Sequence, residues 1–179
     1  MFETSGLWNT WRFAIGGCLA LAMVCGWGCS AAGKFPSWKG LTPVAEAEAN
    51  AIPWQTSYEQ AQAEAGANNK AVMLWFTGSD WCKYCTMLEQ EVFETETFRD
   101  WYGDKVVPVM LDFPRQSSLP PNLQQQNEML KDRYAKMVTS YPTALFVTAD
   151  GEVIGKMGYM KGGPDAWVHR AEGILAVAW

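Results

Sequence analysis

The chain has 179 residues, of which 49% are hydrophobic and 18% charged, and its formal net charge is −5. This composition is typical of a globular protein and argues against a disordered one. No stretch concentrates Lys or Arg, so nucleic acid is not expected as a partner, because phosphate binding needs a basic face.

The N-terminus is typical of a targeting segment. Arg12 precedes an uncharged apolar run, Phe13–Cys29, and the small residues Ser30-Ala31-Ala32-Gly33 follow it. A positive flank, an apolar run and a small-residue exit together describe a secretory signal. Residues 1–32 are therefore predicted to be a signal peptide or, alternatively, a retained membrane anchor or a lipid anchor on Cys29. In each case we expect an exported protein, periplasmic or membrane-attached and facing the periplasm.

Residues 33–53 contain three prolines and an Ala/Glu-rich piece, which predicts a linker. From Trp54 to the C-terminus, residues 54–179, helical and strand patterns follow one another. The predicted helices are Ser57–Ala65, Trp81–Glu91, Thr95–Trp101, Asn127–Met137 and Asp165 to about Ala178. The predicted strands are Ala71–Phe76, Val106–Leu111, Thr143–Thr148 and Val153–Tyr159.

Local signals refine these elements. The unbroken apolar run Ala71–Phe76 indicates a buried central strand. Pro108 gives the second strand an irregular or edge-like start. In the turn Thr77–Asp80, Ser79 or Asp80 is expected to cap the next helix. The segment Phe113–Gln126 is rich in Pro, Ser and Gln and is expected to be a loop.

The order of elements predicts the fold class. The early strands alternate with helices, which calls for parallel pairing, and the last two strands form an antiparallel hairpin through Ala149–Glu152. We therefore expect an α/β domain with a mixed central β-sheet flanked by helices on both faces.

Cys82 and Cys85 are the only cysteines beyond the first thirty residues. Zinc sites use the same spacing, but zinc needs about four ligands, and this part of the chain adds no third Cys and a single His, His169. We predict no metal and no cofactor. A purely structural disulfide stays an alternative, although it would close a very small loop and so constrain the unfolded chain little.

Thiol–disulfide exchange makes use of this arrangement. The pair follows a buried strand and opens a helix, where backbone N–H groups and the helix dipole stabilise a thiolate on Cys82. Cys82 would attack a substrate disulfide, and Cys85 would then attack the mixed disulfide. Lys83 adds a positive charge near the pair and Asp80 opposes it, so the sequence leaves the electrostatic balance open.

The segment Phe76–Cys85, together with Tyr141-Pro142-Thr143 before the next strand, resembles the thioredoxin family from Trp54 to the C-terminus. The chain is most similar to exported bacterial thioredoxin-like proteins, which share the motifs seen here at Gly78–Cys82, Asp112–Arg115 and Gly158-Tyr159. This resemblance implies a thioredoxin fold with a cis peptide bond between Tyr141 and Pro142 facing the dithiol. It further implies that Trp81, Tyr141 and Pro142 form the surface on which a substrate strand binds.

The chain departs from the family pattern in two places. Cytoplasmic-type thioredoxins carry a buried Asp on the strand before the dithiol, and here Trp75 stands roughly at that place. The partner Lys of the next strand falls near Pro108 and is also missing. An indole cannot transfer protons as a carboxyl does, so a reductant, an oxidant and an isomerase all remain open.

The sequence thus predicts a monomeric thiol–disulfide oxidoreductase acting on protein thiols and disulfides with an unidentified redox partner. The alternative is a thioredoxin-fold binding or chaperone-like module whose cysteines are not catalytic. A thiol peroxidase fits less well, because Ser79-Asp80-Trp81 lacks the Pro and Thr usual before a peroxidatic Cys. The segment 113–126 is either a solvated loop or a partner contact.

Overall fold

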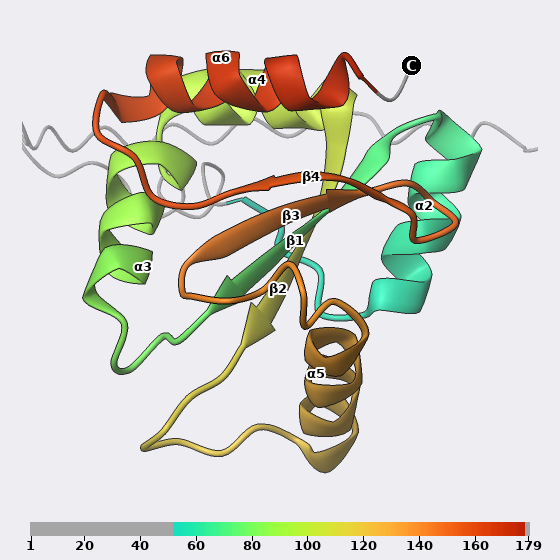
Figure 1. Ribbon diagram of the computed structural model, residues 1–179, viewed down its shortest axis with the longest axis vertical. Helices are drawn as coiled ribbons and strands as arrows, with labels where there is room; N and C mark the ends of the chain where they lie inside the picture. Colours follow the sequence, from blue (N-terminus) through green and yellow to red (C-terminus); the bar gives the residue numbers. More distant parts are fainter. Residues whose placement is uncertain (1–51, 178–179) are drawn as a thin grey trace, which may run out of the picture. The chain divides into compact units, whose positions relative to one another are not determined.

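The computed structural model describes residues 52–177. The predicted signal or anchor, nearly all of the linker and Cys29 lie outside these residues. The helices are α2 (Tyr58–Asn68), α3 (Lys83–Leu88), the π-helix η1 (Glu89–Phe93), α4 (Glu96–Lys105), α5 (Pro121–Arg133) and α6 (Gly163–Leu175) (Figure 1). The strands are β1 (Ala71–Thr77), β2 (Val106–Asp112), β3 (Thr143–Val147) and β4 (Val153–Met157). Within this range, no helix combines the length and the apolar character needed to cross a membrane.

The four strands form one mixed sheet in the order β2-β1-β3-β4. β1 pairs parallel with β2, as predicted, and β3 forms the predicted antiparallel hairpin with β4. The prediction of parallel pairing is wrong for β3, which runs antiparallel to β1. Because β2 and β3 run in opposite directions, the connection through α5 leaves β2 and enters β3 at the same end of the strands. This topology places the start of β3 beside the end of β1, where the dithiol segment begins.

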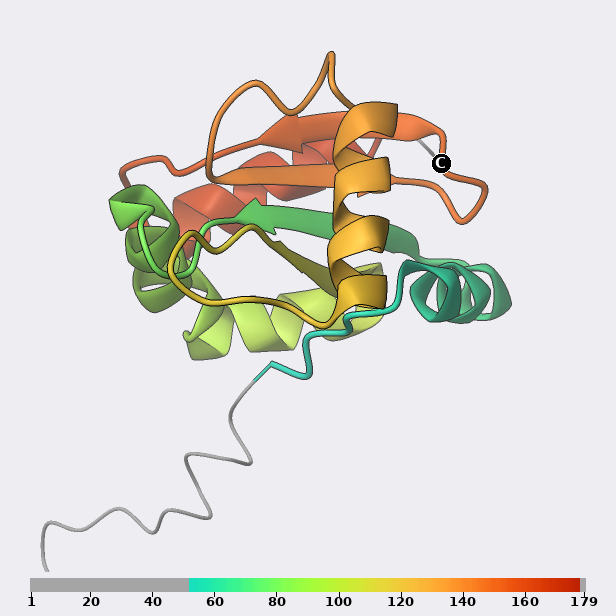
Figure 2. The same ribbon diagram turned by 90° about the horizontal axis from the view of Figure 1, so that it is seen from below.

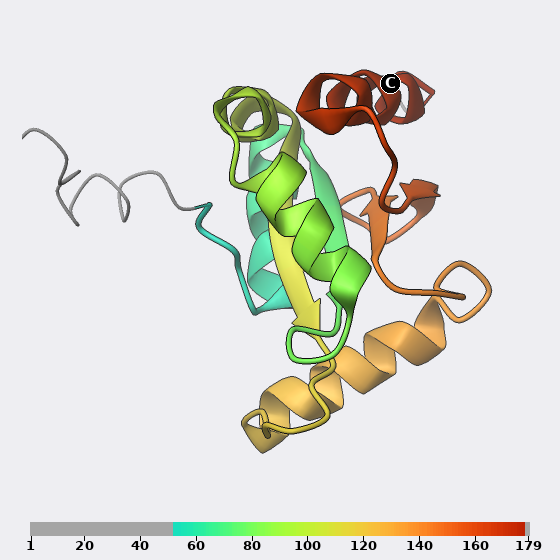
Figure 3. The same ribbon diagram turned by 90° about the vertical axis from the view of Figure 1, so that its left-hand side faces the viewer.

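Strand β1 is central because all seven of its residues are buried. Its side chains alternate between two core clusters, as strand geometry requires. Met73 and Trp75 face the cluster built by α3, η1, α4 and α6. Leu74 and Phe76 face the cluster built by α2 and α5. Figure 2 shows α5 in front of the sheet with α4 and α6 behind it, and Figure 3 shows the sheet between these layers. The predicted helices on both faces are confirmed.

Pro108 lies on the outer side of the edge strand β2. Its carbonyl accepts a hydrogen bond from the Gln55 backbone N–H at 3.0 Å, on the side away from β1. The N–H that proline lacks would point to the same side, so no hydrogen bond to β1 is lost. The expected edge-like character of this strand is confirmed.

Several predicted boundaries are wrong: α2 continues to Asn68 rather than Ala65, and α5 ends at Arg133 rather than Met137. Two errors concern where a helix begins. Residues 121–126 were predicted to be part of a loop, but α5 begins at Pro121 and includes them. Proline suits the first helical turn, where its fixed φ fits and its missing N–H has no partner to lose. The helix predicted for 81–91 begins only at Lys83 and continues as η1 to Phe93. Its N-cap is Cys82 rather than Ser79 or Asp80.

Candidate active site

Cys82 and Cys85 lie at the start of α3 and are joined by a disulfide, with a Cα–Cα distance of 5.2 Å. The Cys82 sulfur caps the helix by accepting the Cys85 backbone N–H at 3.2 Å. Within the described residues this is the one hydrogen bond that the structure gives this sulfur. Cys82 is 7% exposed and Cys85 2%, so Cys82 is the more accessible member of the pair.

The peptide bond between Tyr141 and Pro142 is cis, as the family resemblance implies. Thr143, the next residue, opens β3 and pairs with Phe76 near the end of β1. The Tyr141 ring packs edge-on against Trp81, with 5.4 Å between the ring centroids. Burial raises the pKa of the Tyr141 hydroxyl, and the charge of Glu128 raises it further. The topology thus brings the segment before Pro142 to the residue that precedes Cys82.

Trp81 is held in a fixed orientation beside the disulfide. Its indole N–H donates to the Phe113 carbonyl at 2.8 Å. The Arg115 guanidinium lies over its ring at 3.9 Å from the centroid, a geometry that favours a cation–π interaction. Both partners come from the loop after β2, which the sequence did not connect to Trp81.

An open groove of about 270 Å³ runs between the dithiol helix and the Pro142 segment. Tyr84 and Tyr159 both line this groove, and their ring centroids lie 5.7 Å apart. Tyr84 is 56% exposed, whereas the Tyr159 hydroxyl is fixed by donating to Glu91 at 2.8 Å. The groove is lined by Tyr84, Ser140, Tyr141, Pro142, Gly158 and Tyr159.

Sequence reasoning quoted Gly158-Tyr159 only as a motif and missed Tyr84 and Ser140. The usable signal for Tyr84 was its position between the two cysteines. No comparable local signal marked Ser140, which reaches the groove through the fold of the chain before β3.

Trp75 lies in the same core cluster as both cysteines and is 1% exposed. Its ring packs against Trp54 at 4.9 Å and Phe93 at 5.1 Å. Its indole nitrogen is buried without a hydrogen-bond partner among the described residues. The core cluster that contains the disulfide therefore also contains a buried indole.

Glu89 is a half-buried carboxyl that sequence reasoning missed. It lies four residues after Cys85, where the dithiol helix continues into η1. Burial raises the pKa of this carboxyl, and the negative charges of Glu94 and Asp112 add to the effect. Its position at a helical spacing from Cys85 places it on the same side of the helix.

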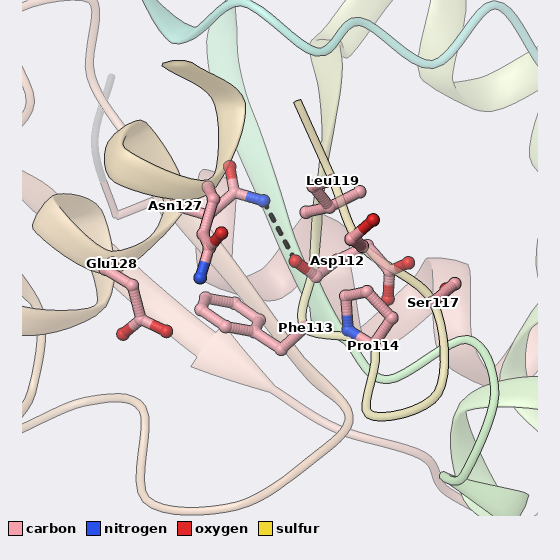
Figure 4. Close-up of a pocket in the computed structure, with 9 residues that line it drawn as sticks. Asp112, Phe113, Pro114, Ser117, Leu119, Asn127 and Glu128 are labelled. Carbon is pink, nitrogen blue, oxygen red and sulfur yellow. Dashed lines mark hydrogen bonds between the residues drawn. The ribbon is translucent and has the colours of Figure 1, made fainter. Parts of the chain in front are cut away.

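A second pocket, of about 180 Å³, lies between the loop after β2 and helix α5 (Figure 4). The amide of the buried Asn127 closes one side by donating to the Asp112 carbonyl at 2.9 Å. Phe113 and Glu128 also line it.

Among residues 52–177, no three His, Cys, Asp or Glu side chains are grouped to hold a metal ion.

Comparisons with known proteins agree with this geometry. Residues 58–168 match the sequence profile of the thioredoxin-like domain family. The disulfide bond reductase DsbH of Chlamydia pneumoniae is 31% identical over 159 residues, which are 89% of this chain and 92% of DsbH. A solved structure of the DsbH oxidoreductase superposes with a TM-score of 0.66 at 28% identity, over 79% of this chain and 94% of that chain. A thioredoxin from Thermus thermophilus shares the fold, with a TM-score of 0.51 at 20% identity over 69% and 87% of the two chains.

Proposed function

Because this chain belongs to the thioredoxin-like domain family, we propose that it reduces protein disulfides outside the cytoplasm through Cys82 and Cys85. The observation that carries the proposal is the Cys82–Cys85 disulfide at the start of α3, beside the cis Tyr141–Pro142 segment. The similarity to a disulfide bond reductase over most of both chains supports the same activity.

The reaction begins from the dithiol form. The Cys82 thiolate attacks a substrate disulfide, a bond forms between the Cys82 sulfur and one substrate sulfur, and the other substrate sulfur leaves as a thiolate and takes up a proton. The Cys85 thiolate then attacks the Cys82 sulfur and releases the second substrate thiol. Two electrons have passed to the substrate, and the protein is left with the Cys82–Cys85 disulfide seen here. A reductant of the dithiol class must restore the starting state.

Substrate binding is assigned to the groove beside the disulfide. Trp81, Tyr141 and Pro142 are the proposed contact residues, and an extended substrate segment would pair with the backbone next to Pro142. Tyr84 and Tyr159 offer two ring faces to the side chains that flank the substrate cysteine. The exposure of Tyr84 supports a contact role, because exposed aromatic rings bury large apolar areas on binding.

The environment of Cys82 supports a reductant rather than a strong oxidant. Strong oxidants of this fold stabilise the thiolate of the reduced form, which makes the disulfide easy to reduce. Here a single backbone N–H reaches the Cys82 sulfur among the described residues, and both cysteines belong to an apolar core cluster that also contains Trp75.

The apolar segment Phe13–Cys29 and the small residues after it support export. An oxidising compartment outside the cytoplasm is also where protein disulfides accumulate and need a reductant. The protein acts there as a monomer, either released after cleavage near Ala32 or attached to the membrane.

Catalysed reduction of insulin by dithiothreitol tests the proposal. The wild-type chain is expected to accelerate insulin precipitation, and the double variant Cys82→Ser/Cys85→Ser is expected to show only the uncatalysed rate, because no other cysteine lies in residues 54–179. If the wild-type chain does not accelerate insulin reduction, and if both it and the double variant still capture a partner protein, the binding or chaperone-like module is favoured instead.

A further inference from the structure

The turn before the dithiol is bonded to the loop that follows β2. Asp112, the last residue of β2, accepts the Ser79 backbone N–H at 2.9 Å and the Ser79 hydroxyl at 2.6 Å. The Phe113 N–H donates to the Thr77 carbonyl at 3.0 Å. These bonds join two segments that lie more than thirty residues apart in the sequence. We call residues 112–117 the anchored loop.

The carboxylate of Asp80 receives three consecutive N–H groups of the anchored loop. The donors are the backbones of Arg115, Gln116 and Ser117, with shortest distances of 2.9, 2.7 and 3.2 Å. These hydrogen bonds, that from Arg115 first, lower the pKa of Asp80. The carboxylate of Asp80 therefore binds the backbone of the loop.

Asp80 does not act as an ordinary helix cap. An Asp just before a helix usually accepts N–H groups of the first helical turn, but here the Cys82 sulfur takes the Cys85 N–H. The partners of Asp80 come from residues 35 to 37 positions later. The carboxylate is thus used to fix a distant loop against the dithiol turn.

The anchored loop in turn contacts two aromatic residues of the site, Trp81 and Tyr141. It binds Trp81 through the Phe113 carbonyl at 2.8 Å and the Arg115 guanidinium at 3.9 Å from the ring centroid. The Phe113 ring also packs edge-on against Tyr141, with centroids 5.6 Å apart. Trp81 precedes Cys82 and Tyr141 precedes Pro142, so one loop orients both flanking aromatic residues. Figure 4 shows Phe113 and Pro114 of this loop lining the pocket that the loop forms with α5.

We propose that Asp80 is a positioning residue for protein substrates: its carboxylate anchors residues 112–117, and through them holds Trp81 and Tyr141 in the orientation that a polypeptide needs to reach Cys82. This inference rests on the proposed function. Asp80 touches neither sulfur through any hydrogen bond of the described structure. Small disulfides that need no flanking surface therefore react independently of it.

Asp80→Ala tests the proposal. The kcat/KM for insulin reduction is expected to fall about tenfold, because the contact surface is no longer held in the productive geometry. The rate with a small aromatic disulfide such as 5,5′-dithiobis(2-nitrobenzoate) is expected to change less than about twofold. Asp80→Asn keeps an oxygen acceptor and should recover most of the insulin activity. Asp100→Ala, which removes an exposed Asp from α4, serves as the matched control and should match the wild type.

Limited trypsin digestion gives a readout independent of activity. Cleavage after Arg115 should be faster in Asp80→Ala than in the wild type and Asp100→Ala, because the N–H groups of the following residues are released. Wild-type insulin kinetics in Asp80→Ala, or an equal loss with insulin and the small disulfide, would overturn the proposal. If Asp80→Ala does not fold, Arg115→Ala replaces it, with a several-fold loss on insulin alone as the expected result and equal losses on both substrates as the contrary one. An inactive wild type would contradict the proposed function instead, and the trypsin comparison would still decide whether Asp80 holds the loop.

Discussion

A reduced Cys85→Ser variant is expected to accumulate as a covalent complex with a protein disulfide substrate, joined through Cys82. Cys82 is the more exposed residue of the pair, at 7% against 2% for Cys85, and it caps the start of α3, so we expect it to form the first bond. Without Cys85, the mixed disulfide must wait for an external thiol. Because the lost step is intramolecular, steady-state turnover should fall by at least about a hundredfold. Non-reducing electrophoresis and mass spectrometry of the complex measure both its amount and the cysteine that carries it.

The matched control is Cys82→Ser, which keeps Cys85. Cys85 is only 2% exposed in the structure, so a substrate disulfide should not reach it. This variant should form no complex and show no catalysed turnover. Equal trapping by the two variants would contradict the assignment of attack to Cys82 and resolution to Cys85.

Trp75→Ala is expected to lower the free energy of unfolding by about 3–5 kcal/mol. Trp75 is 1% exposed, stands on the central strand, and packs against the rings of Trp54 and Phe93. Its removal leaves a cavity at the centre of the cluster that supports the disulfide. Since small domains are stable by only about 5–15 kcal/mol, the variant should show a strongly lowered midpoint in urea denaturation.

Trp75→Phe serves as the control for this prediction. It keeps an aromatic ring against Phe93 and removes the unpartnered indole N–H, so its loss of stability should be well below that of Trp75→Ala. A loss under about 1 kcal/mol in Trp75→Ala would show that the cluster closes over the gap, contrary to the close packing expected of a buried core.

The sequence predicted those parts of the fold that depend on local pattern. The apolar run 71–76 is a buried central strand, Pro108 lies at the sheet edge, and the helices cover both faces. The start of α5 at Pro121 was missed because the composition of 113–126 resembles a loop, whereas proline at the first helical turn favours a helix. The direction of β3 was missed because the alternation of helices and strands alone does not say at which end of the strands a connection enters the sheet.

At the candidate site too, local motifs could be predicted from the sequence and long-range contacts could not. The cysteine pair was visible as a motif, and the cis Tyr141–Pro142 bond followed from the family resemblance. The partners of Asp80 were not visible, because they lie 35 to 37 residues away and are backbone N–H groups without a sequence signature. Asp80 was therefore interpreted as a helix cap or an opposing charge, whereas Cys82 is the cap.

The reduction potential of the Cys82–Cys85 couple, measured by equilibration with glutathione or dithiothreitol buffers, bears most directly on the proposed reductase. The sparse hydrogen bonding of the Cys82 sulfur and the apolar core behind it lead us to expect a value near that of thioredoxin, about −270 mV. A value near about −120 mV, that of a strong oxidant of this fold, would contradict the assignment.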